Sequence, residues 1–444
     1  MRIAFLFGRD LRLQDNQALS HAASIATELL PLYLVPADFD ELSHIRQHSL
    51  VESLTALSDS LPLGLEVTSE KLPDAVKRLS GIEKVVATRA FDTNGMLFQA
   101  ALAEQLYEQG IALELIGSNY AISPGTIVKD DQTPLKVYTP FYKRWLVHGW
   151  DEPYKLDVQS VNWVRPTKTQ YPKPLGPAPI TIRAGEAFAL RTFGRFQARA
   201  LSDYSENRNR PDLSGTSHLS HALAHGEIHP RTLLAKLGEA EGHEVFRKEI
   251  AWREFYADVL YRNPHTLYDY FEPRFQKMRY ADPVADSAAL AAWKAGKTGY
   301  PIVDAAMRQL NQTGWMHNRS RMIVASFLVK DLHFEWQVGA RYFEERLTDF
   351  DPASNSHGWQ WTAGCGTDAS PYYRVFNPVL QGAKFDPNGD YVRKFVPELA
   401  HIENGKVHEP WDLIDGYQHG YPERIVDHSQ ERDESLRRLE EIKK

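Results

Sequence analysis

The sequence predicts an α/β domain with a doubly wound, Rossmann-like parallel sheet, followed by a long connector and an all-helical domain. Three observations point to this fold class. Short apolar runs alternate with amphipathic segments up to about residue 125, which is typical of parallel strands joined by right-handed crossovers. Nine prolines then crowd the segment Pro124–Pro179. From Ala184 onward, the spacing of apolar residues fits a helix.

The first part, residues 1–125, carries the expected sheet. The expected strands are Ile3–Phe7, Leu29–Val35, Leu63–Val67, Lys84–Ala87 and Leu113–Ile116. The expected helices lie near Asp15–Ala26, Leu42–Leu61, Leu72–Leu79 and Leu97–Gln109. No G-x-G-x-x-G motif follows Phe7, so we do not expect a nicotinamide dinucleotide here.

Residues 126–185 are the expected connector, because a structureless stretch of this length is unusual inside one domain. Within it, the segment Val137–Leu146 has the composition of a short helix. Residues 186–444 form the expected helical domain, and their last stretch, Gln430–Lys444, is charged on every face, which predicts a solvated helix or a frayed tail. The other expected helices are Phe188–Tyr204, Thr216–His225, His229–Leu237, Val245–Asn263, Ser287–Ala295, Ile302–Thr313, Asn318–Leu332 and Trp336–Leu347.

Composition and charge exclude several classes of protein. The net charge of the 444-residue chain is −7, so any DNA binding must come from a local basic face. The one cysteine, Cys365, excludes internal disulfides and a four-cysteine iron–sulfur cluster. The histidines lack metal-ligand spacing, so no metal is expected. The apolar run IAFLF is too short for a signal peptide, and no run approaches the roughly 20 residues that span a bilayer. We therefore expect no membrane contact and a cytoplasmic location.

The hexapeptide GTSHLS, Gly215–Ser220, precedes an apolar helical run. Hydroxyl groups and free backbone amides at the start of a helix can hold a phosphate. The alternative is a plain helix N-cap.

Glu249 and Trp252 are three residues apart, so on a helix they share a face. A carboxylate beside an indole suits a nucleobase, because the acid accepts hydrogen bonds while the indole stacks. The alternative is a core tryptophan beside a surface glutamate.

Asn318 and Met322 are four residues apart and would share another helix face, with Arg319 and Arg321 beside them. An amide both donates and accepts, and arginine binds a phosphate or forms a buried ion pair. A solvated, charged helix face is the alternative. Two downstream acids are candidate partners for Arg321, namely Asp349 and Asp351.

In NSHGWQW, two tryptophans closely follow Asn355. If this segment is extended, the indoles of Trp359 and Trp361 point to one side, and if it is helical they diverge. Two core tryptophans are the alternative to an aromatic pocket.

Together these segments resemble the photolyase/cryptochrome flavoprotein family, and most closely the class I cyclobutane pyrimidine dimer (CPD) photolyases. The resemblance runs from FGRDLRLQDN to YPERIVDHSQ and is densest in WREFY, GKTGYPIVDAAMRQLNQTGWMHNRSRM, ASFLVKDL, NSHGWQW and RVFNP. So many matches in a fixed order are a specific signal. The resemblance implies an N-terminal α/β domain and a C-terminal helical domain that holds a U-shaped FAD.

The resemblance also implies a set of cofactor-binding and catalytic residues. Asn355 would face the reactive edge of the flavin, where an amide serves the reduced anionic ring without adding a negative charge. Trp359 and Trp336 would be the inner steps of a tryptophan chain that photoreduces FAD, and Glu249 would act at the lesion. The implied contacts to FAD are Tyr204, Thr216, Ser217, His218, Leu219, Ser220, Arg321, Asp349, Asp351 and Asn355.

The implied partner is DNA that contains pyrimidine dimers, bound by a protein expected to be a monomer. Excited, reduced FAD would give one electron to the dimer, the cyclobutane ring would split, and the electron would return. The implied lesion pocket comprises Glu249, Trp252, Asn318, Met322 and Trp361, and the implied strand contacts are Arg208, Arg319, Arg374 and Gln381.

Four departures from the family pattern stand out. His218 occupies a position where the family usually has arginine, and the outermost tryptophan of the chain has no clear counterpart, Tyr280 being nearest. The acid that binds a folate antenna in many relatives falls at about Gly95, and a helping lysine is missing near Asp269. These two differences argue against a methenyltetrahydrofolate antenna, while a deazaflavin, another chromophore or an empty site stay open.

Two alternatives belong to the same family. A blue-light sensory cryptochrome of plant type typically has aspartate where Asn355 stands and a long C-terminal extension, whereas only a short tail follows Gln430 here. A (6-4) photoproduct lyase usually has a catalytic histidine where Asn318 lies, and His317 is one residue early. A photolyase that prefers single-stranded DNA also stays open.

Overall fold

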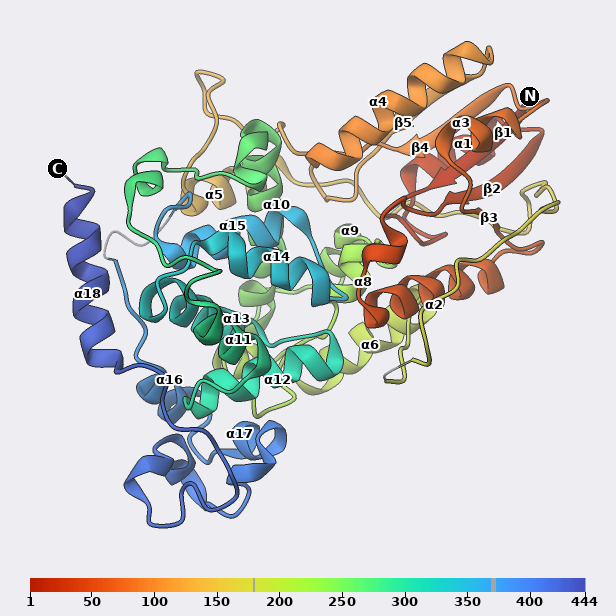
Figure 1. Ribbon diagram of the computed structural model, residues 1–444. Coiled ribbons are helices and arrows are strands. Elements are labelled where there is room, and N and C mark those ends of the chain that lie inside the picture. Colours follow the sequence, from red (N-terminus) through yellow and green to blue (C-terminus); the bar gives the residue numbers. More distant parts are fainter. Residues whose placement is uncertain (179, 369–372, 444) are drawn as a thin grey trace. The chain divides into compact units, whose positions relative to one another are not determined.

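The computed structural model describes residues 1–178, 180–368 and 373–443 (Figure 1). Pro179, the last residue of the proline-rich segment, and Lys444, the last residue of the charged tail, lie outside the described residues. The chain forms two compact units. The first comprises Met1–Ser202 and Ser217–Pro264, and the second comprises Asp203–Thr216 and His265–Lys444. The domain limits 125/126 and 185/186 stay a prediction, since these units follow spatial contacts and not chain order.

The first unit contains a five-stranded parallel sheet in the order β3-β2-β1-β4-β5. This order confirms the doubly wound fold class. One predicted strand was misplaced, because Gly64, with φ of +86°, forms a turn and the strand begins only at Glu66. The strands are β1 (Arg2–Phe7), β2 (Glu28–Leu34), β3 (Glu66–Thr68), β4 (Lys84–Thr88) and β5 (Ala112–Ile116).

Helices cover both faces of this sheet. Ile3, Phe5 and Phe7 pack in one apolar cluster with α1 (Gln17–Ile25) and α2 (His44–Ser60). The residues between them along the strand pack in a second cluster with α3 (Leu72–Lys77) and α4 (Thr93–Glu108). This alternation follows from the period of two in a strand. The helix α4 begins four residues before its predicted start, because Asp92 caps it by accepting a hydrogen bond from the Gly95 amide.

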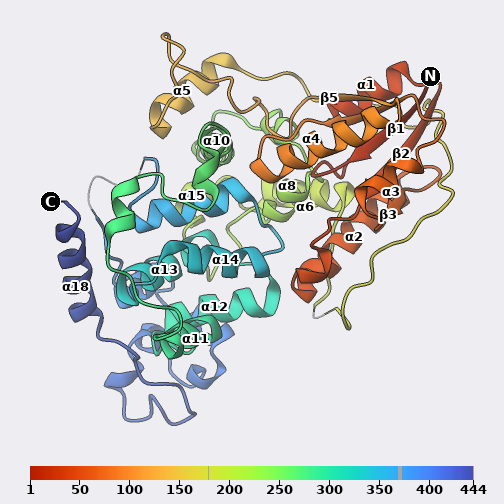
Figure 2. The same ribbon diagram turned by 45° about the horizontal axis from the view of Figure 1, so that its top comes forward.

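The described part of the predicted connector contains one α-helix, α5 (Tyr138–His148), which lies beside α10 (Glu241–Arg262) in both views (Figure 1, Figure 2). The buried carboxylate of Glu254 on α10 accepts hydrogen bonds from the Ala121 amide at 2.5 Å and from Trp145 Nε1 at 2.6 Å. Burial raises the pKa of this carboxyl group. The remaining helices of the unit are α5 (Tyr138–His148), α6 (Glu186–Arg199), α8 (Ser220–His225), α9 (Pro230–Leu234) and α10 (Glu241–Arg262).

The regular elements in the described part of the second unit are all helices, and the unit has its own apolar core. The helix expected over Asn318–Leu332 ends at Ser326 and continues as a π-helical turn, Phe327–Asp331. The charged tail is a helix that buries Ser435 and Leu439, so it is not solvated on every face. The helices are α7 (Tyr204–Asn207), α11 (Ser287–Ala295), α12 (Pro301–Thr313), α13 (Asn318–Ser326), α14 (Trp336–Arg346), α15 (Pro352–Ala363), α16 (Pro378–Phe385), α17 (Asp390–Phe395) and α18 (His428–Glu441).

A glycine sets the packing of α14 against α15. A Cβ atom added at Gly339 would overlap the six-membered ring of Trp359 and would lie 2.6 Å from Leu328 Cδ2. Such contacts are far inside van der Waals distance, and overpacked cores lose stability. The missing side chain of Gly339 therefore allows the indole of Trp359 to reach its buried position.

We predict that Gly339→Ala lowers the free energy of unfolding by about 1–3 kcal/mol. Trp359→Phe removes the ring atoms that collide, so Gly339→Ala should cost clearly less in the Trp359→Phe background. Chemical denaturation of the four proteins of this double-mutant cycle measures the difference. An identical cost in both backgrounds would show that the indole does not set the packing.

Candidate functional site

An ion pair with a buried carboxylate joins α13 to the segment before α15. Arg321 Nη2 lies 2.7 Å from Asp349 Oδ2, and Arg321 Nε donates to the Met316 carbonyl oxygen at 2.9 Å. The Asp349 side chain is fully buried. A buried carboxylate is tolerated only when it is paired, so Arg321 fixes this segment. The prediction that a downstream acid pairs with Arg321 is confirmed for Asp349.

Asp351 begins the next helix. Its Oδ1 accepts a hydrogen bond from the Ser354 amide at 2.9 Å, which makes Asp351 the N-cap of α15. One turn later, Asn355 Nδ2 donates to the Ala340 carbonyl oxygen at 3.1 Å. Because a carbonyl oxygen can only accept, the amide nitrogen of Asn355 faces α14. The cap and this bond together hold the Asn355 side chain in one orientation.

The segment NSHGWQW is helical, so its two indoles diverge. Trp359 is 3% exposed and packs against Phe343 with ring centroids 5.0 Å apart. Trp361 is half-buried, and its Nε1 donates to the Asp368 carbonyl oxygen at 3.1 Å. Trp359 therefore lies in the core, whereas Trp361 lies at a partly exposed position.

A pocket of the second unit is lined by Trp336, Gln337, Phe350 and Asn355, among others. Two of these lining residues have a buried polar atom without a partner among the described residues, namely Trp336 Nε1 and Gln337 Oε1. Elsewhere in the unit, Asp349 Oδ1 and Trp359 Nε1 are two further examples. A buried polar group left unpaired costs about 1–3 kcal/mol. The pocket has a volume of about 30 Å³, which is room for a water molecule or two and not for a ring system.

Two tyrosines extend the aromatic contacts of Trp336. The Tyr270 ring meets Trp336 edge-on with centroids 6.2 Å apart, and it stacks on Tyr280 at 6.3 Å. The Tyr270 hydroxyl donates to Glu335 Oε1 at 3.1 Å. Burial raises the pKa of both phenols. Tyr280 was considered from sequence as the nearest outer residue, whereas Tyr270 was missed because its contact with Trp336 joins residues far apart in the chain.

The second unit also holds two arginines, Arg208 and Arg319, which we call the basic cluster. Arg319 donates to Asn209 Oδ1 through Nε at 3.2 Å and Nη2 at 2.7 Å, and its guanidinium lies 4.4 Å from the Phe385 ring centroid. Burial, and then the charge of Arg208, lower the pKa of Arg319. Within the described part of the chain, Arg319 has no carboxylate partner. A guanidinium without a carboxylate partner suits a phosphate.

Four further predicted contacts lie around these elements. Asn318 is exposed at the first turn of α13, and Met322 is half-buried one turn later on the same face. Arg374 is exposed and Gln381 is half-buried on α16. Their side chains are therefore accessible to a ligand in varying degree.

Glu249 and Trp252 lie on α10, half-buried, as the three-residue spacing predicted. The structure adds a neighbour that sequence reasoning missed. Tyr138 of α5 stacks on Trp252 with ring centroids 3.8 Å apart and planes 7° apart, and its hydroxyl donates to the Lys248 carbonyl oxygen at 2.8 Å. One face of the Trp252 indole is therefore occupied by protein, and the aromatic residues of YTPFYKRW were the available signal.

The segment Ser217–Ser220 precedes a shorter helix than predicted. The helix begins at Ser220 and not at Thr216, because His218 adopts a φ of +52°. The residue at the N-cap is Leu219, so the plain side-chain cap considered as an alternative is wrong. Tyr204, at the start of α7 in the second unit, is buried. The backbone and hydroxyl groups of Ser217 and His218 therefore lie before the first turn of α8 and outside a regular helix.

The described residues contain no group of three or more histidine, cysteine, aspartate or glutamate side chains arranged to hold a metal ion. Among the helices that the structure describes, none combines the length and apolarity needed to cross a membrane.

Comparisons with known proteins agree with this geometry. Residues 3–157 match the model of the DNA photolyase family, and residues 246–441 match the FAD binding domain of DNA photolyase. A deoxyribodipyrimidine photo-lyase of Agrobacterium fabrum is 37% identical over 99% of this chain and 97% of its own length.

Two crystal structures are also similar. A bacterial class III photolyase from Agrobacterium tumefaciens has a TM-score of 0.90 and 36% identity, over 100% of this chain and 98% of that one. An archaeal photolyase from Sulfolobus tokodaii, with two FAD molecules, has a TM-score of 0.85 and 26% identity, over 99% and 100% of the two chains. With near-complete coverage at more than 30% identity, the chain belongs to the DNA photolyase family and carries that family's FAD-binding domain.

Proposed function

We propose that this protein is a carbon–carbon lyase that splits cyclobutane pyrimidine dimers in DNA under blue light. The observation that carries the proposal is the near full-length similarity to a deoxyribodipyrimidine photo-lyase. The match of residues 246–441 to the FAD binding domain of DNA photolyase supports it. When bound, reduced FAD supplies the electron that opens the dimer and takes it back afterwards.

The roles of individual residues are part of this proposal. Asn355, held by the Ala340 carbonyl, would meet the reactive edge of the flavin, where an amide adds no negative charge to the reduced ring. Arg321, Asp349 and Asp351 would lie along the cofactor. The remaining proposed FAD contacts are Tyr204, Thr216, Ser217, His218, Leu219 and Ser220.

The proposed substrate contacts combine stacking and charge. Stacking on Trp252 and Trp361 at about 1–3 kcal/mol per base would offset the cost of flipping the damaged pair. The basic cluster around Arg319 would hold the strand. The proposed lesion and strand contacts are Glu249, Trp252, Asn318, Met322 and Trp361, with Arg208, Arg319, Arg374 and Gln381.

The finer identity of the protein is also proposed. We place it with class I CPD photolyases, as a monomer in the cytoplasm, and the similarity to a class III photolyase leaves the class I assignment a prediction. The second chromophore stays open, with folate disfavoured by Gly95 and Asp269.

Repair of a defined lesion tests the proposed function. Reduced protein, incubated under blue light with an oligonucleotide that carries one cyclobutane dimer, should restore the two pyrimidines, as followed by chromatography. A dark sample is the control. An unchanged dimer in the light would contradict the proposal and favour a sensory cryptochrome, whereas repair of a (6-4) photoproduct alone would assign the other lyase.

The outer steps of flavin photoreduction generate a second prediction. An oxidised tyrosine must release its proton, and Glu335 accepts the hydrogen bond of Tyr270. We propose that Trp336, after giving its electron inward, is refilled by Tyr270, whose proton passes to Glu335, and that a thiol in solution restores the tyrosine.

Tyr270→Phe should therefore slow the photoreduction of oxidised FAD in the presence of thiol at least several-fold, as measured by the loss of flavin absorbance under blue light. Tyr342→Phe is the matched control, because Tyr342 is also buried in the second unit and donates to Asn311 Oδ1. Equal rates in the two variants would exclude Tyr270 from the route.

A further inference from the structure

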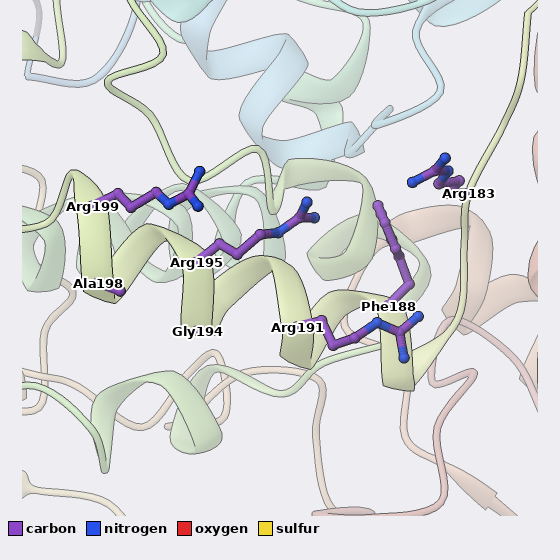
Figure 3. Close-up of a pocket in the computed structure, with 7 residues that line it drawn as sticks. All are labelled: Arg183, Phe188, Arg191, Gly194, Arg195, Ala198 and Arg199. Carbon is purple, nitrogen blue, oxygen red and sulfur yellow. The ribbon is translucent and has the colours of Figure 1, made fainter.

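One face of α6 carries a ladder of arginines. Arg191, Arg195 and Arg199 are four residues apart and project from successive turns of the helix, and Arg183 lies just before it (Figure 3). All four are exposed. We call these four residues the arginine ladder.

The charges of the arginine ladder are not neutralised within the described residues. No carboxylate lies within ion-pair distance of any of the four guanidiniums in the part of the chain that the structure describes. The polar partner of Arg195 is Thr192 Oγ1, at 3.2 Å, and its guanidinium lies 6.0 Å from the Phe188 ring centroid. The one acid on α6, Glu186, accepts hydrogen bonds from the Leu13 and Gln14 amides.

The arginine ladder borders an open hollow of about 710 Å³. Gly194 and Ala198 are the small residues of its lining, between the long arginine side chains (Figure 3). Gly194 lies in a helix interior, where glycine is disfavoured. An added Cβ atom there would meet nothing within 4 Å. The fold of the chain therefore does not require this glycine, and its bare backbone leaves room for a ligand to approach α6 closely.

We propose that the arginine ladder binds the phosphates of a nucleic-acid backbone, as a contact surface in addition to the lesion contacts. The proposal rests on the proposed function, which makes DNA the partner. Helical residues four apart are about 6 Å apart along the axis, so the three helical arginines extend over about 12 Å. Phosphates of one DNA strand recur about every 3.4 Å along the duplex axis, so this length covers about three of them.

The chemistry of the arginine ladder favours phosphates without reading sequence. The guanidinium fork matches phosphate oxygens, and Phe188 adds an aromatic surface. A chain with a net charge of −7 repels DNA at long range, so it needs local positive surfaces to hold undamaged DNA while it searches for a lesion. The arginine ladder would therefore contribute to affinity for any duplex, damaged or not.

The salt dependence of binding to an undamaged duplex tests this proposal. The full-length protein, the triple variant Arg191→Gln/Arg195→Gln/Arg199→Gln and a control triple variant Arg165→Gln/Lys168→Gln/Lys173→Gln are compared by fluorescence anisotropy. The control residues are exposed in the same unit and change the net charge equally. Each phosphate contact contributes about −0.9 to the slope of log K against log salt concentration, so the slope of the ladder variant should be shallower by about 2–3. The control should keep the wild-type slope.

A ladder variant with the slope of the control would overturn the proposal, provided that flavin content and circular dichroism show an intact fold. Poly-glutamate serves as a probe for an acidic protein partner. If the ladder variant bound poly-glutamate less tightly than the wild type but kept the wild-type salt slope on DNA, the proposal would be overturned and the surface would be assigned to an acidic protein. Failure of the wild-type protein to repair the dimer would instead reject the proposed function. The two failures can be distinguished, because the binding assay uses undamaged DNA and needs no light.

Discussion

The pairing of one buried carboxylate with one arginine ties α13 to the segment that leads into α15. Asp349 has no access to water, so its charge is tolerated only because Arg321 neutralises it. This pair fixes the segment that leads into α15, and Asp351 then caps that helix. The start of α15 sets the direction of every residue that follows, so Asn355 points at α14 and Trp359 enters the core. The positions of Asp351 and Asn355, two of the proposed flavin contacts, thus follow from the segment that this ion pair holds.

The sheet and most helices could be predicted because their causes are local. Strands buried on both faces leave continuous apolar runs, and only β3 was misplaced, since the turn at Gly64 interrupts its run. The three-residue spacing of Glu249 and Trp252 placed them correctly on one helix face. In these cases the spacing of residues along the sequence matches the period of the strand or helix that they form.

The rest depended on contacts between distant residues. α15 was not identified, because polar residues and both tryptophans surround the helix and erase its apolar stripe. The π-helical turn after Ser326 has no periodic signature that separates it from an α-helix. Tyr138 and Tyr270 contact tryptophans that are far away in the chain, so no local pattern in the sequence indicates these contacts. The site residues themselves were predicted from a family resemblance, and the structure adds the neighbours that each of them contacts.

The central claim is that residues 246–441, which match the FAD binding domain of DNA photolyase, bind FAD. The most direct test is the absorption spectrum of the purified protein, with the flavin released by denaturation and quantified against the protein concentration. The account predicts flavin bands and about one FAD per chain. A colourless protein that also takes up no FAD on reconstitution would contradict it.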